Sequence, residues 1–259
     1  MDELNNMTSG SAGSFRWAVL SDVGKVRQKN EDAYIVEPEI GLFIVSDGMG
    51  GHMGGALASK IVIEDLSVMI ENKLYALRSG SPRSVARIFR TAIAQQSVHL
   101  WMEGVHGDGF REMGATVVVL MVRGGRAYVA NLGDSRIYLF RGGKLRQVTR
   151  DHSVVSELVE QGKIEPDEAR EHVAAGQITR YVGMEDNAVA HVRTFAIKKG
   201  DRFLLCSDGL TDMLRNRRIR AILAREGDPL AACEKLISRA NLGGGHDNIT
   251  TLIVDYIAS

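Results

Sequence analysis

Leu42-Phe43-Ile44-Val45-Ser46-Asp47-Gly48-Met49-Gly50-Gly51 is the stretch from which the fold can be inferred. Its first half is an apolar run rich in β-branched residues, which predicts a buried strand that breaks at Asp47. After further glycines, residues 56–70 have the apolar spacing of a helix. The side chains expected to face inward are Leu57, Ile61, Val62, Leu66, Met69 and Ile70. A strand that ends in Asp-Gly leaves a carboxylate with little bulk around it, which indicates a site for a metal ion or a phosphate.

The composition excludes several classes of function. The chain has 259 residues, enough for a full core, and its 32 basic residues balance its 32 acidic ones. A net charge of zero gives no general attraction to nucleic acids or anionic membranes, so we expect neither as a partner. Both cysteines, Cys206 and Cys233, lie in apolar patterns, which favours a reducing compartment. With no long apolar run and no signal-like N-terminus, we expect a cytoplasmic protein.

The order of the expected elements predicts an α+β fold with helices layered on antiparallel sheets. Residues 1–14 are polar and rich in Gly and Ser, so we expect a disordered leader followed by a single domain over residues 15–259. Strands are expected at 15–21, 33–36, 116–122, 127–132, 136–141, 195–198, 203–207 and 249–256. Helices are expected at 84–101, 212–224 and 229–241, with two short ones at 153–161 and 166–172 in a polar insert that ends near residue 187.

Three carboxylates occur at the ends of expected strands, each beside glycine. Asp47 and Asp208 both lie in Ser-Asp-Gly, and Asp247 follows a run of glycines directly before the last strand. Carboxylate and carbonyl oxygens without clustered Cys or His suit Mg²⁺ or Mn²⁺. For any one of these sites alone, a simple Asp-Gly turn is the better interpretation. The hypothesis of a metal site rests on the repetition.

Six motifs give the chain a resemblance to a known family over about residues 15–258. It resembles the metal-dependent protein serine/threonine phosphatases (the PPM, or type 2C, family), in particular the compact bacterial members. Any one motif is weak, but six in the same order are specific. They are Arg27 with Glu31-Asp32, Asp47-Gly48-Met49-Gly50-Gly51-His52, Gly114-Ala115-Thr116, Gly133-Asp134-Ser135-Arg136, Ser207-Asp208-Gly209-Leu210 and Gly245-His246-Asp247-Asn248.

The resemblance implies a four-layer αββα sandwich with a binuclear Mn²⁺ or Mg²⁺ centre between the sheets. By position, Asp47 would bridge the two metals, Asp208 and Asp247 would hold one, and the Gly48 carbonyl the other. A metal-bridging water would attack phosphoserine or phosphothreonine in a protein substrate, without a phosphoenzyme.

The same resemblance assigns the remaining site residues. Glu31 and Asp32 would act on the metals directly or through ligated waters, and Asp134 would serve a third, weaker metal. Arg27 would bind the substrate phosphate as a bidentate fork. The catalytic residues are therefore Arg27, Asp47 and Asp208. The insert at 153–187 would be a mobile flap that tunes substrate choice. The implied partners are phosphoproteins, among them a serine/threonine kinase and its targets, and the implied state is a monomer.

Two positions depart from patterns known in the family. Eukaryotic members have a His directly after Asp-Gly, where this chain has Met49, as is usual for bacterial members. We do not assign the acid role to His52 nearby, since a ligated water could supply the proton. Where some bacterial members have a flap serine near the third metal, this chain has Gly176, so the sequence leaves a third ion open.

Other functions remain as alternatives. The glycine loop could cradle a nucleotide, but Met53 stands where a dinucleotide fingerprint needs glycine. Cys233 and Arg239 have the Cys-x5-Arg spacing of cysteine-dependent phosphatases, although they lie in an amphipathic helical pattern. The main alternative is a catalytically weak relative that acts as a regulatory or phosphoprotein-binding module. The presence of every family aspartate that can be placed favours the enzyme.

Overall fold

The strands form two antiparallel sheets of six strands each. A computed structural model describes residues 6–50, 54–77, 80–106, 113–186 and 188–258. In spatial order, the first sheet contains β1 (Asn6–Ala12), β2 (Phe15–Asp22), β12 (Ile249–Tyr256), β11 (Arg202–Cys206), β8 (Arg136–Arg141) and β9 (Lys144–Gln147). The second contains β10 (His191–Ala196), β7 (Arg126–Leu132), β6 (Val117–Arg123), β4 (Leu42–Met49) and β3 (Asp32–Glu37), with β5 (Gly114–Ala115) paired to β4.

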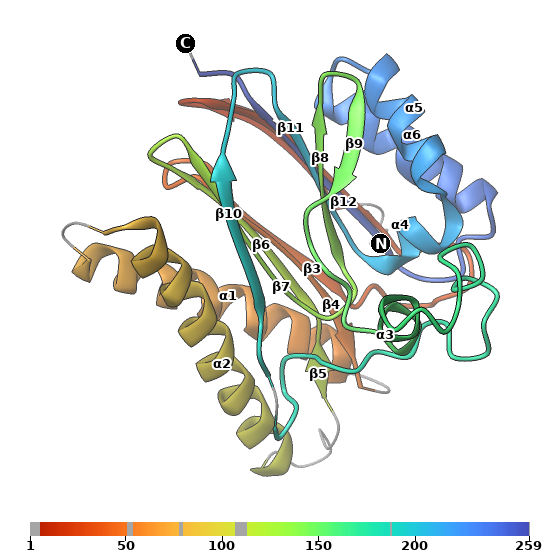
Figure 1. Cartoon of the computed structure of the whole chain (residues 1–259), viewed down its shortest axis with the longest axis horizontal. Helices are drawn as coiled ribbons and strands as arrows, with labels where there is room; N and C mark the ends of the chain where they lie inside the picture. Colours follow the sequence, from red (N-terminus) through yellow and green to blue (C-terminus); the bar gives the residue numbers. More distant parts are fainter. Residues whose placement is uncertain (1–5, 51–53, 78–79, 107–112, 187, 259) are drawn as a thin grey trace.

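Helices cover the outer face of each sheet, so the molecule has four layers (Figure 1). The long helices α1 (Gly54–Ala76) and α2 (Pro82–His106) pack on the second sheet. The first sheet is covered by α4 (Asp208–Met213), α5 (Asn216–Arg225) and α6 (Pro229–Leu242). The short α3 (Val154–Glu160) lies in the connection between β9 and β10. This confirms the expected αββα sandwich.

Strand β4 shows why the first apolar run is continuous. Leu42 and Ile44 pack toward α1 and α2, whereas Phe43 and Val45 pack between the two sheets. Because successive side chains of a strand point to opposite faces, a strand buried on both faces needs apolar residues at every position. The sequence predicted that this strand breaks at Asp47, and that prediction is wrong. Gly48 and Met49 continue the strand and pair with β5.

The expectation of a disordered leader over residues 1–14 is wrong for the described part. Asn6–Ala12 forms the edge strand β1, paired with β2 from Asn6↔Ser21 to Ala12↔Phe15. The composition of the segment gives no sign of this strand, because its stability comes from backbone pairing with β2. Gly10 allows the approach, since a Cβ there would lie 2.9 Å from the Trp17 ring.

Three expected helical features are also wrong. The helix expected at 212–224 is two helices, because the backbone is extended at Leu214, whose side chain is buried. Residues 166–172 form consecutive turns, in which backbone bonds join residues three apart, such as Glu171 N to Glu168 O. Leu57 was expected to face inward, but it is 37% exposed. The buried side of α1 runs through Ala58, Val62, Leu66, Ile70 and Leu74 instead. The edge strand β9 was not predicted.

A search for membrane-spanning segments among the described residues finds no helix that combines the length and the apolar character needed to cross a bilayer.

Candidate metal centre

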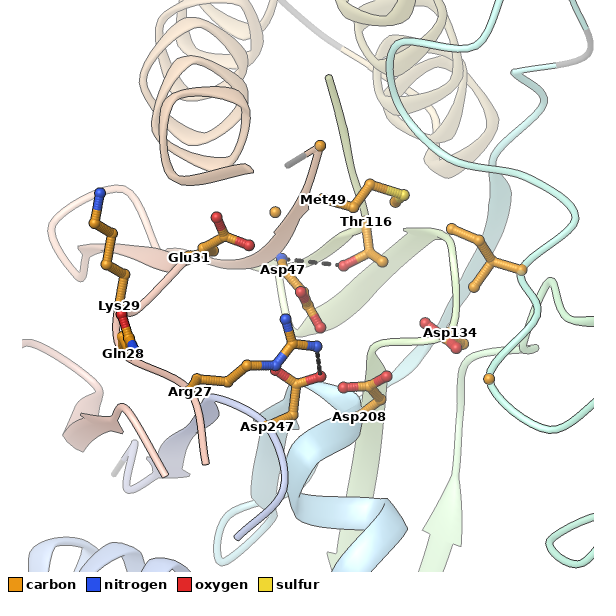
Figure 2. A pocket seen from close by; sticks show the side chains of 14 residues that line it. Arg27, Gln28, Lys29, Glu31, Asp47, Met49, Thr116, Asp134, Asp208 and Asp247 are labelled. Carbon is orange, nitrogen blue, oxygen red and sulfur yellow. Dashed lines mark hydrogen bonds and ion pairs between the residues drawn. The ribbon is translucent and has the colours of Figure 1, made fainter. Parts of the chain in front are cut away.

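One pocket, with a volume of about 570 Å³, collects most of the predicted site residues. It is lined by Arg27, Gln28, Lys29, Glu31, Asp47, Gly48, Met49, Gly50, Thr116, Asp134, Gly176, Ile178, Asp208 and Asp247. In Figure 2 the Asp47, Asp208 and Asp247 carboxylates point toward a shared space, with Glu31 to one side and Asp134 to the other. Asp32 does not line the pocket.

Asp47 is positioned by Thr116 on the neighbouring chain segment. The Asp47 backbone N–H donates to Thr116 Oγ1 at 3.1 Å, and the Thr116 N–H donates to the Asp47 carbonyl at 2.8 Å. Thr116 Oγ1 also lies 2.7 Å from Ser135 Oγ, next to Asp134. One threonine thus connects the two motifs that contain Asp47 and Asp134. The sequence identified Thr116 only as part of a motif and assigned it no role.

Asp208 lies at the start of a helix rather than in a turn. Ser207 is the N-cap residue of α4 and Asp208 is in its first turn, so the helix dipole favours the charged carboxylate. Asp208 is half-buried, and its buried Oδ1 has no hydrogen-bond partner among the described residues. Burial and repulsion from Asp134 and Asp212 raise the pKa of Asp208 well above its usual value.

Glu31 and the Gly48 carbonyl converge on one point beside Gly55. A Cβ on Gly55 would lie 2.8 Å from Glu31 Oε2 and 2.9 Å from Gly48 O. Gly48 itself has no room for a side chain, since its Cβ would meet Gly55 O at 2.0 Å. The two glycines therefore allow a carboxylate oxygen and a carbonyl oxygen to face the same space.

Arg27 and Asp247 form an ion pair at the mouth of the pocket. Arg27 Nη2 donates to Asp247 Oδ2 at 2.8 Å (Figure 2), and the Arg27 side chain is 51% exposed. Exposed pairs of this kind are worth about 0.2–1 kcal/mol, so the guanidinium can exchange this partner for another anion.

Asp32 lies behind the pocket and connects the two sheets. Its Oδ2 accepts hydrogen bonds from Ser207 Oγ at 2.7 Å and Thr250 Oγ1 at 2.6 Å, whereas its Oδ1 has no partner among the described residues. Burial raises the pKa of Asp32 to about 6. Burial and the charge of Asp151 raise the pKa of Asp134 to about 7.

The carboxylates of the pocket repel one another strongly. Burial, followed by repulsion from Asp32, Asp208, Asp134 and Asp247, raises the pKa of Asp47 well above its usual value. Buried like charges of this kind require a compensating positive charge.

The donor set fits divalent cations that prefer oxygen ligands. No three His, Cys, Asp or Glu side chains of the described residues are already close enough to enclose a metal ion, and Asp247 faces Arg27 instead. However, Asp208 and Asp32 each keep one buried carboxylate oxygen without a partner among the described residues, and Glu31 and Gly48 present oxygens to one space. Oxygen donors with several negative charges suit Mg²⁺ or Mn²⁺.

Asn248 is a positioning residue to which sequence analysis assigned no role. Its Nδ2 donates to the Val23 carbonyl at 3.0 Å and to the Lys29 carbonyl at 2.9 Å, and its Oδ1 accepts from the Glu31 N–H at 2.8 Å. These three bonds hold residues 23–31, which include Arg27, against the segment of Asp247. The only sequence signal was its place directly after Asp247.

We expect Asn248→Ala to weaken metal binding about 10- to 100-fold, because outer residues that orient ligands have effects of this size. Titration calorimetry with Mn²⁺ measures this effect. Asn241→Ala is the matched control, since Asn241, near the end of α6, makes one side-chain hydrogen bond among the described residues, to Asp22 at 3.1 Å. Equal affinity in the wild type and Asn248→Ala would show that residues 23–31 hold their position without this amide.

The chemistry of cysteine-dependent phosphatases is not available at Cys233. The thiol is buried within α6 and lies 3.5 Å from the Ala18 carbonyl and 3.6 Å from the Thr251 carbonyl. Burial raises the pKa of Cys233 to about 12, so the nucleophilic thiolate does not form near neutral pH. His52 and Met53, named in the sequence analysis, lie outside the described residues.

Comparisons with known proteins show what the whole chain is similar to. A family model described as "Protein phosphatase 2C" matches residues 25–241. The protein phosphatase PhpP of Streptococcus pneumoniae is 35% identical over 243 residues, which span 92% of this chain and 96% of that protein.

Two solved structures are similar over nearly the whole chain. The serine/threonine phosphatase Stp1 of Staphylococcus aureus superposes with a TM-score of 0.84 and 29% identity, covering 96% of this chain and 97% of the other. The catalytic domain of the phosphatase PstP, in complex with two manganese ions, has a TM-score of 0.77 and 30% identity, covering 94% and 98%.

Proposed function

The chain belongs to the protein phosphatase 2C family, and we propose that its pocket hydrolyses phosphoserine and phosphothreonine in proteins with the help of two divalent metal ions. The observation that carries this proposal is the convergence of Asp47, Asp208, Asp247, Glu31 and the Gly48 carbonyl on one pocket. That a related catalytic domain contains two manganese ions supports the same number here.

We propose that Asp47, Asp208, Asp247, Glu31 and the Gly48 carbonyl would hold the two ions. Bound metal would supply positive charge for the phosphate and acidify a water molecule near neutral pH. Asp32 supports the arrangement from behind through Ser207 and Thr250. Asp134 would hold a third ion, and Gly176, which also lines the pocket, offers no side-chain ligand for it.

Arg27 would orient the substrate phosphate. It now pairs with Asp247, and a phosphate that enters the pocket would compete with that carboxylate for the guanidinium. A phosphate dianion accepts two parallel N–H bonds from arginine, which makes the exchange favourable. Lys29 also lines the pocket, but its side chain points away from the Asp47, Asp208 and Asp247 carboxylates (Figure 2).

We expect Arg27→Lys to raise KM for a phosphothreonine peptide about tenfold, because an ammonium cannot make the bidentate contact. Steady-state kinetics with saturating Mn²⁺ measures KM and kcat separately. Arg126→Lys, at a half-buried position in β7, is the control. A large fall in kcat with KM unchanged would contradict a role in substrate binding and would place Arg27 at the transition state.

The proposal extends to the organisation and setting of the chain. Residues 15–259 would form one catalytic domain, in which residues 153–187 are a flap beside the pocket. The Arg170 side chain supports this, since it donates to the Thr211 and Asp212 carbonyls of α4.

The substrates would include a serine/threonine kinase and its targets, and the enzyme would act as a monomer. Two buried free cysteines fit the reducing cytoplasm.

The test is phosphate release from a phosphothreonine peptide by the purified protein with Mn²⁺ and with EDTA. Release that requires Mn²⁺ supports the enzyme. If calorimetry shows bound Mn²⁺ but no phosphate is released, the protein is a phosphoprotein-binding or regulatory module instead. Release that persists in EDTA would contradict the proposed metal chemistry.

A further inference from the structure

Helix α5 presents a strongly basic surface that the catalytic pocket does not use. Residues 216–225 bury Ile219, Ile222 and Leu223 against the first sheet layer. The opposite side of the helix is exposed and contains two alanines, Ala221 and Ala224. Arginines surround them, and we call this set the α5 face: Arg215, Arg217, Arg218, Arg220 and Arg225, all exposed.

The α5 face has no acidic partners among the described residues. None of its five arginines forms a salt bridge there, although other arginines such as Arg16, Arg141 and Arg150 do. The segment 215–225 contains no Asp or Glu, in a chain whose total charge is zero. The positive charge is therefore a local concentration.

The arginines at the start of α5 do not serve the stability of the helix, whereas Arg225, in the last turn, is placed favourably for the helix dipole. Arg217 and Arg218 lie in the first turn, which contains no acidic residue, and the helix dipole disfavours cations there. Arg217 and Arg220 are three residues apart, a spacing at which like charges repel. A helix selected only for stability or solubility would carry mixed signs, so the arrangement indicates an anionic partner.

The α5 face is held rigidly close to the pocket. Tyr138 Oη donates to Asn216 Oδ1 at 3.0 Å at the start of α5, and Arg202 donates to the Glu226 carbonyl at its end. The chain runs directly from Asp208, in the pocket wall, through α4 to α5 (Figure 1). At 1.5 Å per helical and 3.4 Å per extended residue, the path from Asp208 to the start of α5 is about 16 Å long.

We propose that the α5 face docks an acidic segment of the phosphoprotein substrate while the phosphorylated side chain occupies the pocket. This proposal rests on the proposed phosphatase function. An extended peptide covers about 16 Å in roughly five residues, so the acidic residues would begin about five positions from the phosphorylated one. Arginine is suited to this role, because its guanidinium binds carboxylates with two parallel hydrogen bonds.

The test compares four phosphothreonine peptides. Each contains four glutamates or four glutamines that begin five residues from the phosphothreonine, either before it or after it. The enzymes are the wild type, Arg217→Gln/Arg220→Gln, and the control Arg83→Gln/Arg87→Gln. The control removes the same charge from exposed positions of α2, on the opposite layer. Both kcat/KM with Mn²⁺ and direct peptide binding by fluorescence anisotropy are measured.

For the wild type and the control, we expect kcat/KM to be about tenfold higher for the glutamate peptide than for the glutamine peptide in at least one of the two placements. The difference should come from a lower KM. The α5 variant should lose most of this preference and keep its activity on the glutamine peptide. Salt should reduce the preference, because the screening length is about 8 Å at physiological ionic strength. No preference in the wild type, or equal preference in the α5 variant, would overturn the docking proposal.

Failure of the two proposals gives different results. If no peptide is hydrolysed, the phosphatase proposal fails, and anisotropy still decides whether the α5 face binds glutamates. If the glutamine peptide is hydrolysed but the glutamates have no effect on KM or binding, only the docking proposal fails. The variant is expected to fold, since it removes cations from positions where they repel the helix dipole or one another.

Discussion

Replacing Asp208 with asparagine is expected to lower turnover about 10³-fold or more, while the metal-free protein becomes more stable. The first effect follows if Asp208 is a metal ligand, since an amide donates no negative charge to the ion. The second follows from the crowding of carboxylates: Asp208 is repelled by Asp134, Asp212, Asp247 and Asp32, and its buried Oδ1 has no partner among the described residues. A neutral side chain of the same shape removes that repulsion.

The measurement is thermal unfolding of both proteins in EDTA and in Mn²⁺, together with phosphate release. The wild type should gain stability from Mn²⁺ by mass action, and Asp208→Asn should gain much less. Asp167→Asn is the matched control, because Asp167 is exposed and outside the pocket. A fall in the melting temperature of Asp208→Asn in EDTA would show that the carboxylate stabilises the metal-free fold, contrary to this interpretation.

Replacing Arg202 with methionine is expected to lower the free energy of unfolding by about 3 kcal/mol or more. The Arg202 side chain is 8% exposed and binds Asp255 through two bonds, Nε to Oδ1 at 2.6 Å and Nη2 to Oδ2 at 2.8 Å. It also donates to the Glu226 carbonyl at 2.5 Å and the Gly227 carbonyl at 2.8 Å, at the end of α5. Methionine keeps the packing of the stem but leaves these acceptors unpaired.

Arg16→Met provides the matched control on the same carboxylate. Arg16 also contacts Asp255 Oδ2, at 2.9 Å, but its side chain is 45% exposed. Exposed pairs contribute about 1 kcal/mol or less, so this variant should change little. Urea denaturation in EDTA gives both free energies. Equal losses in the two variants would show that burial of the Arg202 pair has no special effect, and Arg202→Met with Asp255→Leu should recover part of the loss.

Much of the architecture could be predicted because its signals are local. The run Leu42–Val45 is apolar at every position, as a strand between two layers must be, and the structure places alternate residues on its two faces. The closing strand Ile249–Tyr256 was predicted at its observed bounds. The six motifs indicated the family and the α+β class before any contact was known.

Other elements could not be read from local pattern. Nothing in residues 6–12 predicts a strand, since β1 exists only through its pairing with β2. The break between α4 and α5 at Leu214 depends on where that side chain enters the core. Residues 166–172 have helical composition but lie in turns, where Arg170 donates to two carbonyls of α4.

By itself, the sequence determined which chemical groups are present in the motifs: oxygen ligands, glycines beside them, the arginine Arg27 and no clustered Cys or His. Only the tertiary structure decided how these groups meet. Asn248 holds Glu31 across 217 residues of chain, and Arg27 pairs with Asp247 across 220. The physical reason is that a motif fixes the type and the local spacing of its side chains, whereas contacts between distant segments depend on how two sheets and their helices pack together.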